Sequence, residues 1–333
     1  MNRREFSKLL ALGAYGFHPA LSMAAEISSA KANHDFFPEA EESGFLAVKG
    51  GKIWYRLNGR QHFASGKTPL IILHGGPGSS HHYLLPFLDL ANERPVILYD
   101  QLDCGLADRP NDPSNWNVER FVSEIESIRI ALGLDRVALF GNSCGATWAA
   151  EYATRQAAGL EALILGSPFL SGPRYLRDAK KLLGQLPADV VSIIEHHEAA
   201  GTINNEEYHE AIFVWYQRHV CRLDPWPDFL NRTIELFNND LYHNMWGPSE
   251  PTLSGSLKDY DIEPKLNLIK APTFYLCGEH DEMTPTTVSI FAKQTPDSKF
   301  KSYKGASHTP HIEARSEFMQ DVSQFLSLSD ASV

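Results

Sequence analysis

The sequence predicts an α/β protein with a mostly parallel, doubly wound sheet and an inserted helical cap. Short apolar runs rich in β-branched and aromatic residues alternate with helical segments in both outer parts of the chain, which indicates strand–helix–strand units. A glycine-flanked serine directly follows one of these runs, and residues 171–266 depart from the alternation. Ligands of such sheets bind beyond the carboxyl ends of the strands, so functional residues are expected just after them.

The apolar patterns place the elements along the chain. Residues 45–48 and 52–57 flank a Gly-Gly pair and predict a β-hairpin. Further strands are predicted at residues 69–73, 95–100, 137–140, 160–165, 273–277 and 300–303. Apolar residues at helical spacing predict helices at residues 83–91, 118–132 and 146–155.

Residues 171–266 have a mostly helical pattern and are unusually aromatic. The aromatic residues include Trp215, Tyr216, Trp226, Phe229, Tyr242 and Trp246. A second independent domain is the alternative, but no Gly/Ser/Pro-rich linker bounds the segment, which favours a cap folded over the site. The core is therefore expected at residues 25–170 and 267–333.

Composition and charge exclude several classes of function. The chain has 333 residues and a net charge of −11, with no Lys/Arg run that could follow a phosphate backbone, so nucleic acid is not an expected partner. No stretch approaches the ~20 apolar residues of a membrane span. The four cysteines lack the C-x-x-C spacing of a metal site, so we expect free buried thiols and neither a metal nor a cofactor.

The N-terminus resembles an export signal. Arg3 and Arg4 are followed by Phe6 and Lys8, then by a short apolar run at residues 9–17 and small residues up to position 24. This layout is typical of a twin-arginine signal. An amphipathic first helix is the alternative, and two glycines and a proline would weaken it. We expect residues 1–24 to engage the twin-arginine export machinery and the mature protein to be periplasmic or secreted.

Residues 141–145 read Gly-Asn-Ser-Cys-Gly and lie between a predicted strand and a predicted helix, the setting of a nucleophile elbow. Ser143 is the expected nucleophile, at the apex of the tight turn. Cys144 follows the apex, which disfavours a cysteine nucleophile. A serine at the apex also excludes the aspartate nucleophile of a dehalogenase or epoxide hydrolase.

An acid and a base follow later strands in the order Ser, Asp, His. Asp281 ends the sequence Gly-Glu-His-Asp after one strand, and His308 ends Gly-Ala-Ser-His after the last strand. His308 would accept the proton of Ser143, and Asp281 would hold the imidazole in one tautomer. The neighbouring rivals are Glu279 and Glu282 for the acid, and His280 and His311 for the base.

A glycine-rich loop supplies the fourth part of this chemistry. Residues 74–78 read His-Gly-Gly-Pro-Gly after the first central strand. The backbone N–H groups of Gly76 and Cys144 are the expected oxyanion hole. A phosphate-binding role is disfavoured because no Gly-Lys-Ser/Thr follows.

The combination of these motifs resembles the proline iminopeptidase family of α/β-hydrolase serine peptidases. It comprises the 74–78 loop, Tyr-Asp-Gln-Leu at 99–102, the Ser143 elbow, Gly278 to Asp281, and His308. Arg-His-Val-Cys-Arg at 218–222 and Met-Trp-Gly-Pro-Ser-Glu at 245–250 resemble its branch of tricorn-associated aminopeptidases and amino-acid amidases. The resemblance runs from about Gly44 to the C-terminus and implies cleavage of an N-terminal residue, often proline, from short peptides, amides or arylamides.

The family resemblance also implies that cap carboxylates bind the free α-amine of the substrate. One matches Glu250, in the same motif as Trp246, which is expected to line the pocket. The other would match Phe213, and Glu210, one turn earlier, is a possible substitute. The chain departs from the family pattern at residues 103–107, at Cys144 and at Ala146 in the elbow, and at Phe213.

The leading hypothesis is therefore a cofactor-independent serine hydrolase that cleaves a small peptide or amide through an acyl-enzyme. The alternative is an esterase, lactonase or acyl-amide hydrolase that uses the same triad without recognising a free amine. A third hypothesis is an exported binding protein that has lost catalysis; the complete Ser-Asp-His set argues against it.

Overall fold

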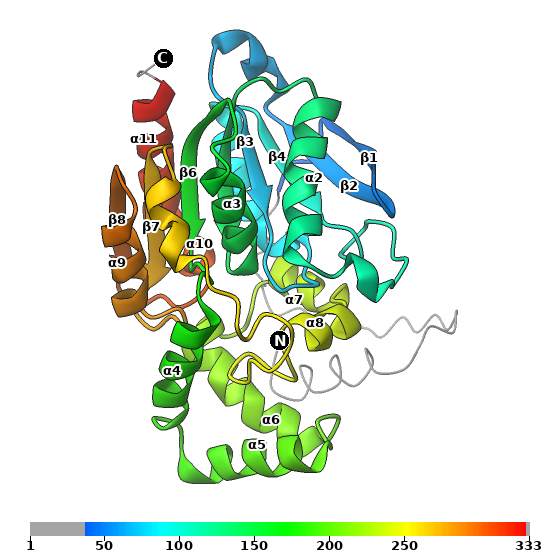
Figure 1. The fold of residues 1–333 in the computed structure, drawn as a ribbon, viewed down its shortest axis with the longest axis vertical. Helices are drawn as coiled ribbons and strands as arrows, with labels where there is room; N and C mark the ends of the chain where they lie inside the picture. Colours follow the sequence, from blue (N-terminus) through cyan, green and yellow to red (C-terminus); the bar gives the residue numbers. More distant parts are fainter. Residues whose placement is uncertain (1–36, 331–333) are drawn as a thin grey trace, which may run out of the picture.

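The computed structural model describes residues 37–330, and the expected export signal at residues 1–24 lies outside them. An eight-stranded sheet runs through the molecule in the order β1-β2-β4-β3-β5-β6-β7-β8 (Figure 1). The strands are β1 (Glu42–Val48), β2 (Gly51–Asn58), β3 (Leu70–Leu73), β4 (Val96–Asp100), β5 (Val137–Asn142), β6 (Leu160–Gly166), β7 (Thr273–Gly278) and β8 (Ser298–Tyr303). The predicted fold class is confirmed.

The sheet is antiparallel only at its N-terminal edge. β1 pairs with β2 and β2 pairs with β4 in antiparallel register, whereas all later pairs are parallel. β3, β4 and β5 are buried along their whole length, which explains their continuous apolar sequences. Because these strands run parallel, their carboxyl ends meet at one edge of the sheet.

Helices cover both faces of the sheet and form two apolar cores. Ile71 and Leu73 face the first core, whereas Leu70 and Ile72 face the second, as the alternation of a strand requires. On the first face lie α2 (Val118–Ala131), α3 (Cys144–Thr154) and α9 (Pro285–Gln294). On the second lie a 3₁₀ helix (His81–Asn92), α10 (Pro310–Glu313) and α11 (Arg315–Asp330). Shorter 3₁₀ helices span Arg60–Ser65, Pro113–Asn115 and Glu263–Leu268.

Two helices differ from the sequence prediction in detail. The helix expected at residues 83–91 is a 3₁₀ helix that spans His81–Asn92 and contains Pro86. Proline has no N–H and its ring clashes with the preceding turn of an α-helix, so a regular α-helix is not available there. The helix expected at residues 146–155 begins at Cys144, because Ser143 of the elbow is its N-cap residue.

Residues 171–266, here called the cap, lie between β6 and β7 and pack beyond the carboxyl ends of the strands (Figure 1). The cap contains α4 (Gly172–Leu183), α5 (Ala188–Ala200), α6 (Glu206–Trp215), a π-helix (Tyr216–Val220), α7 (Asp228–Glu235) and α8 (Asn239–Met245). Its aromatic residues Tyr175, Trp215 and Trp246 belong to the same apolar cluster as Leu165 and Tyr275 of the sheet. The cap is thus continuous with the core rather than a separately packed unit.

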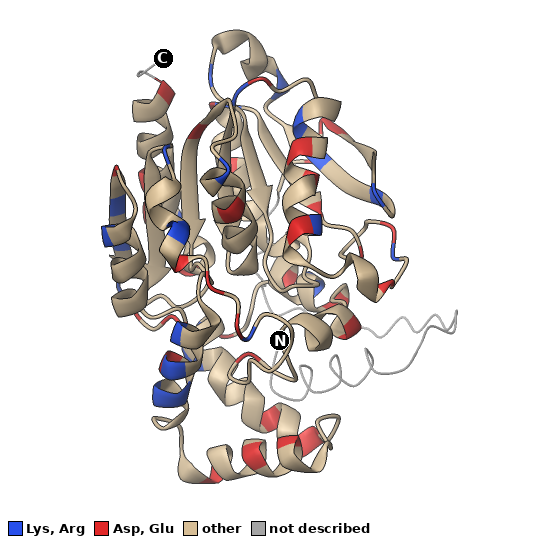
Figure 2. Cartoon of the chain, in the orientation of Figure 1, with Lys and Arg blue, Asp and Glu red and all other residues tan. Residues whose placement is uncertain are grey.

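Charge and cysteines follow simple patterns in the described part of the chain. Figure 2 shows basic residues gathered on α4 and acidic residues on α5. All four cysteines are buried and free, as the sequence predicted. Among residues 37–330 no helix is both long enough and apolar enough to cross a bilayer.

Candidate active site

Ser143 occupies a strained turn at the carboxyl end of β5. Its backbone angles are φ 56° and ψ −124°, a conformation that non-glycine residues adopt at a cost of order 1–3 kcal/mol. The turn is tight on both sides: a Cβ added to Gly145 would lie 2.4 Å from the Leu73 carbonyl oxygen, and one added to Gly75 would lie 2.7 Å from Ser143 Cβ. Glycine is therefore required at both positions, and the side chain of Ser143 is held at the strand end.

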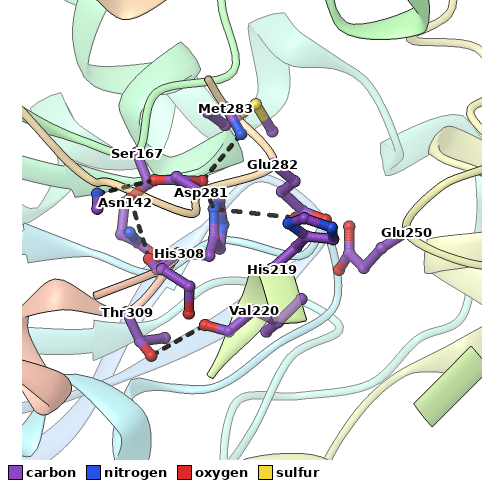
Figure 3. Close-up of polar contacts among 12 residues, drawn as sticks. Asn142, Ser167, His219, Val220, Glu250, Asp281, Glu282, Met283, His308 and Thr309 are labelled. Carbon is purple, nitrogen blue, oxygen red and sulfur yellow. Dashed lines mark hydrogen bonds and ion pairs between the residues drawn. The ribbon is translucent and has the colours of Figure 1, made fainter. Parts of the chain in front are cut away.

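His308 and Asp281, the predicted base and acid, are hydrogen-bonded to each other. His308 Nδ1 lies 2.8 Å from Asp281 Oδ1, so the ring donates its Nδ1 proton to the carboxylate (Figure 3). Asp281 is buried and also accepts the backbone N–H of Met283 at 2.8 Å. Among the rival acids, Glu282 lies at 3.8 Å from the same ring nitrogen, beyond hydrogen-bonding distance. The geometry therefore favours Asp281 as the residue that orients the imidazole.

The end of β6 is hydrogen-bonded to both Ser143 and His308, the predicted nucleophile and base. The carbonyl of Gly166 accepts the Ser143 N–H at 3.0 Å, and the next residue, Ser167, donates its hydroxyl to the His308 carbonyl at 3.0 Å. Ser143 and His308 are thus fixed to adjacent residues of one strand end. The three residues that the sequence ordered as Ser, Asp and His lie at one edge of the sheet.

The rival histidines have other surroundings. His311 Nε2 donates to the Tyr83 carbonyl at 3.1 Å, and its ring packs against Phe87 and Phe318. Burial lowers the pKa of His311 to about 3, so it stays neutral within the core. His280 offers its backbone carbonyl to the cap, whereas its own ring is partly exposed.

The 74–78 loop is fixed beside the elbow by polar contacts. The N–H of Gly75 donates to the Tyr83 hydroxyl at 2.8 Å, and that hydroxyl donates to Asn142 Oδ1 at 2.8 Å. Within residues 37–330 the N–H groups of Gly76 and Cys144 have no hydrogen-bond acceptor. Two unengaged donors near the serine are what an oxyanion hole needs.

A pair of carboxylates, Glu250 and Glu282, lies next to His308 (Figure 3). Glu282 is 0% exposed, and its Oε2 accepts the indole N–H of Trp215 at 2.8 Å. The other oxygen, Oε1, has no hydrogen-bond partner among the described residues. Burying a carboxylate without full hydrogen bonding is costly, and such exceptions are common where a ligand binds.

The two neighbouring carboxylates shift each other's pKa values and that of His308. Burial raises the pKa of Glu282 well above its ordinary value, and the neighbouring Glu250 raises it further. Burial also raises the pKa of Glu250, while His308 opposes that rise. Burial disfavours the charged form of His308, but Asp281, Glu282 and Glu250 outweigh it and raise the pKa of the imidazole to about 9. A cation bound beside the two carboxylates would lower both of their pKa values and favour their charged forms.

A carboxylate of α5 holds the loop that delivers Glu250. Glu198 Oε1 accepts the hydroxyls of Tyr208 at 2.9 Å, Ser249 at 3.0 Å and Thr252 at 2.9 Å. Tyr175 donates its hydroxyl to the Glu250 carbonyl at 2.6 Å. The backbone on either side of Glu250 is thus tied to the cap helices.

Two of the predicted substrate residues, Trp246 and Phe213, are buried in the cap. Trp246 is 0% exposed and donates its indole N–H to the carbonyls of Ser249 and Glu250 at 3.2 Å, so it supports the Glu250 loop from behind. Phe213 is buried in α6 and packs against Trp226, with 5.5 Å between ring centroids. Glu210 lies on the same helix, one turn earlier.

A carboxylate next to Glu250 comes from the Asp281 loop, namely Glu282. Sequence reasoning considered Glu282 only as a rival catalytic acid. The available signal was the adjacency of two acids after β7: one engages His308 and the next one faces the cap.

Comparisons with known proteins identify the family of the chain. The family model of the α/β hydrolase fold matches residues 68–315. The chain belongs to the α/β-hydrolase family. A protein named proline iminopeptidase from Heyndrickxia coagulans is 42% identical over 284 residues, covering 85% of this chain and 98% of the relative. The resemblance inferred from the motifs is confirmed, and the chain is a hydrolase.

Solved structures extend the agreement to the whole fold. The crystal structure of VinJ superposes with a TM-score of 0.83 at 36% identity, covering 87% of this chain and 99% of that one. The crystal structure of a proline iminopeptidase from Mycobacterium smegmatis gives a TM-score of 0.79 at 35% identity, with the same coverage.

The described residues offer no evident metal site. No group of three or more His, Cys, Asp or Glu side chains within residues 37–330 is arranged to hold a metal ion. The chemistry that the arrangement supports directly is nucleophilic: a serine, an oriented histidine and a pair of backbone donors.

Proposed function

We propose that this α/β hydrolase is an aminopeptidase that removes one N-terminal residue, proline or a similar residue, from short peptides, amides or arylamides. The observation that carries the proposal is the acidic pair beside the catalytic histidine. Glu282 Oε1 lies 3.8 Å from His308 Nδ1, is buried, and lacks a hydrogen-bond partner among the described residues.

The position of the acidic pair matches a substrate cut directly after its first residue. The α-nitrogen and the carbonyl carbon of an amino acid are about 2.5 Å apart, since only Cα separates them. When the α-ammonium group of a substrate binds Glu250 and Glu282, the carbonyl of that same first residue therefore lies close to the catalytic residues. A longer N-terminal extension would have to displace this contact. The relatives named proline iminopeptidase support proline, a secondary amine, as the first residue.

The chemical steps follow from the groups present. Ser143 Oγ attacks the carbonyl carbon while His308 takes its proton, and Asp281 stabilises the imidazolium. The N–H groups of Gly76 and Cys144 stabilise the oxyanion of the tetrahedral intermediate. His308 then protonates the leaving amine, which leaves an acyl-enzyme on Ser143. Water, activated by the same histidine, hydrolyses that ester and releases the amino acid.

Substrate panels test the proposal directly. Prolyl and other aminoacyl arylamides, their N-acylated forms and simple aryl esters would be compared on protein that lacks residues 1–24. We expect turnover of free-amine arylamides, loss of turnover on blocking the amine, and no turnover by Ser143→Ala. Ser192→Ala, at an exposed position on α5, is the matched control. Equal rates with blocked and free amines, or activity on esters alone, would favour the ester, lactone or acyl-amide alternative.

We also propose that residues 1–24 direct the protein to the twin-arginine export machinery, and that the mature enzyme acts in the periplasm or outside the cell. The proposal rests on the Arg3-Arg4 pair and the short apolar run that follows it. Replacing both arginines with lysine is expected to retain the protein inside the cell, as measured by fractionation. Unchanged localisation of that variant would refute the proposal.

A further inference from the structure

One short segment of the cap touches both loops that carry the acid and the base. The π-helix Tyr216–Val220 follows α6 and ends against the core. π-Helical turns are rare, are frequent at functional sites, and widen the backbone locally. Here the widened turn places His219 between the Asp281 loop and the His308 loop.

His219 contacts the two loops with two different groups. Its Nδ1 lies 2.8 Å from the His280 carbonyl oxygen, and because a carbonyl can only accept, Nδ1 carries the proton and donates it. Its own backbone carbonyl accepts the N–H of His308 at 3.0 Å. One cap residue thus fixes the residue before Asp281 and the catalytic base itself.

The contact from His219 is reinforced four residues earlier on the same helical surface. Trp215 donates its indole N–H to Glu282 at 2.8 Å, and its ring lies against the ring of His219 with 4.8 Å between centroids. The cap therefore holds the residues on both sides of Asp281. The Asp281 carboxylate itself accepts the N–H of Met283 in the same loop, and the loop is fastened to the core by the N–H of His280, which donates to the Ala306 carbonyl at 2.9 Å.

The surroundings of the His219 ring show that it is not a surface side chain. The residue is 7% exposed, and burial lowers its pKa, which keeps the ring neutral with a single N–H. That single proton is used on the His280 carbonyl, and Nε2 has no partner among the described residues. The hydrogen bond to the Asp281 loop is thus the polar interaction that the ring makes with the protein.

We propose that His219 is a positioning residue of the catalytic machinery, whose ring N–H holds the Asp281 loop in the register in which Asp281 meets His308. Without this hydrogen bond the acid loop is fastened to the core alone, and the 2.8 Å contact between Asp281 and His308 loosens. The inference rests on the proposed function in one respect: it takes Ser143 as the nucleophile that His308 and Asp281 activate.

Three substitutions separate the ring N–H from other roles of the side chain. His219→Asn keeps an N–H donor at the position of Nδ1, since both atoms are bonded to Cγ. His219→Phe keeps the ring against Trp215 but has no donor. His219→Gln carries the same amide one carbon farther out and cannot place a donor at the Nδ1 position. His196→Phe, at an exposed position on α5, is the control for loss of a cap histidine.

We expect kcat to fall roughly ten- to a hundredfold in His219→Phe and His219→Gln, the range that a displacement of about 1 Å near the reacting groups can cause. The rate of fluorophosphonate labelling of Ser143 should fall in parallel, while KM changes little. His219→Asn and His196→Phe should stay close to the wild type in both measurements. Tm values of the variants, measured alongside, show whether the protein is folded at the assay temperature.

The pH profile adds a measurement that a merely structural role would leave unchanged. The acidic limb of kcat/KM reports the pKa of the base, which must be neutral to act. Because Asp281 raises the pKa of His308, loosening their contact should move this limb to lower pH in His219→Phe and His219→Gln.

Three outcomes would overturn the inference, and a different one would refute the proposed function. Wild-type kcat and an unmoved acidic limb in His219→Phe would overturn the inference, as would an equal loss in His219→Asn and His219→Phe or full activity in His219→Gln. Failure of the wild-type protein to be labelled at Ser143 would instead refute the proposed function.

Discussion

Neutralising one carboxylate of the acidic pair should cost binding of free amines selectively. The change is Glu282→Gln, which preserves the volume of the side chain and leaves an oxygen to accept the Trp215 indole N–H. It removes the ionisable group, so that no negative charge can form at Oε1, the oxygen without a partner among the described residues, when an ammonium binds there. The geometry of the Asp281–His308 pair does not depend on this oxygen.

The magnitude follows from the value of a hydrogen bond to a charged group. Such a bond contributes about 1.5–3 kcal/mol net in proteins. Since each 1.36 kcal/mol corresponds to a factor of ten in rate, Glu282→Gln should lower kcat/KM for free-amine arylamides by about 10- to 150-fold. The loss should appear mainly in KM, because the interaction is already made in the ground state.

The assay compares a prolyl arylamide with its N-acylated form, both at one pH on wild type and variant. Glu195→Gln, at an exposed position on α5, is the control for removing one negative charge from the protein. The reasoning fails if Glu282→Gln lowers kcat/KM equally for blocked and free substrates, or leaves both unchanged. The first result would assign Glu282 to the chemical step and the second would remove it from the substrate site.

Four further outcomes follow from the structure. Ser143→Ala should lower kcat by about 10⁶-fold, as loss of a triad nucleophile does, measured against protein that is equally folded by circular dichroism. Glu250→Gln removes a charge that raises the pKa of His308, so the acidic limb of kcat/KM should move to lower pH; a limb that moves up would contradict the assignment. Glu198→Gln weakens the acceptor that holds the Glu250 loop and should raise KM for free amines while rates on blocked substrates stay the same. The raised pKa of Glu282 means that the fold loses stability as pH rises above about 4.3, the ordinary value, so Glu282→Gln should have the higher Tm at pH 8, with the difference vanishing below pH 4.

The predicted catalytic residues could be placed from the sequence because each lies in a short local motif. The elbow at residues 141–145 needs small residues around a strained serine, and all of these residues lie within five consecutive positions of the sequence. Asp281 and His308 each follow a strand directly, and parallel strands bring their carboxyl ends together by topology. The strand positions themselves followed from apolar runs, with errors of up to three residues at their ends.

The substrate side of the site could not be read in the same way. Glu250 and Glu282 lie in different loops and meet only because the cap packs on the edge of the sheet. The ring of Phe213 packs in the apolar core against Trp226, and Trp246 donates its indole N–H to the Glu250 carbonyl. The substrate-binding role expected for Glu210 stays a prediction. The spacing of residues along the sequence does not predict which buried carboxylate lacks a hydrogen-bond partner.

The sequence by itself thus determined the fold class and the family, and it placed the predicted nucleophile, acid and base at strand ends, because these depend on backbone geometry within a few residues of each motif. Only the tertiary structure decided which carboxylates meet beside His308 and that His219 contacts both the Asp281 loop and the His308 loop. Burial and proximity between distant segments produce these features, and both arise only when the cap and the sheet pack together.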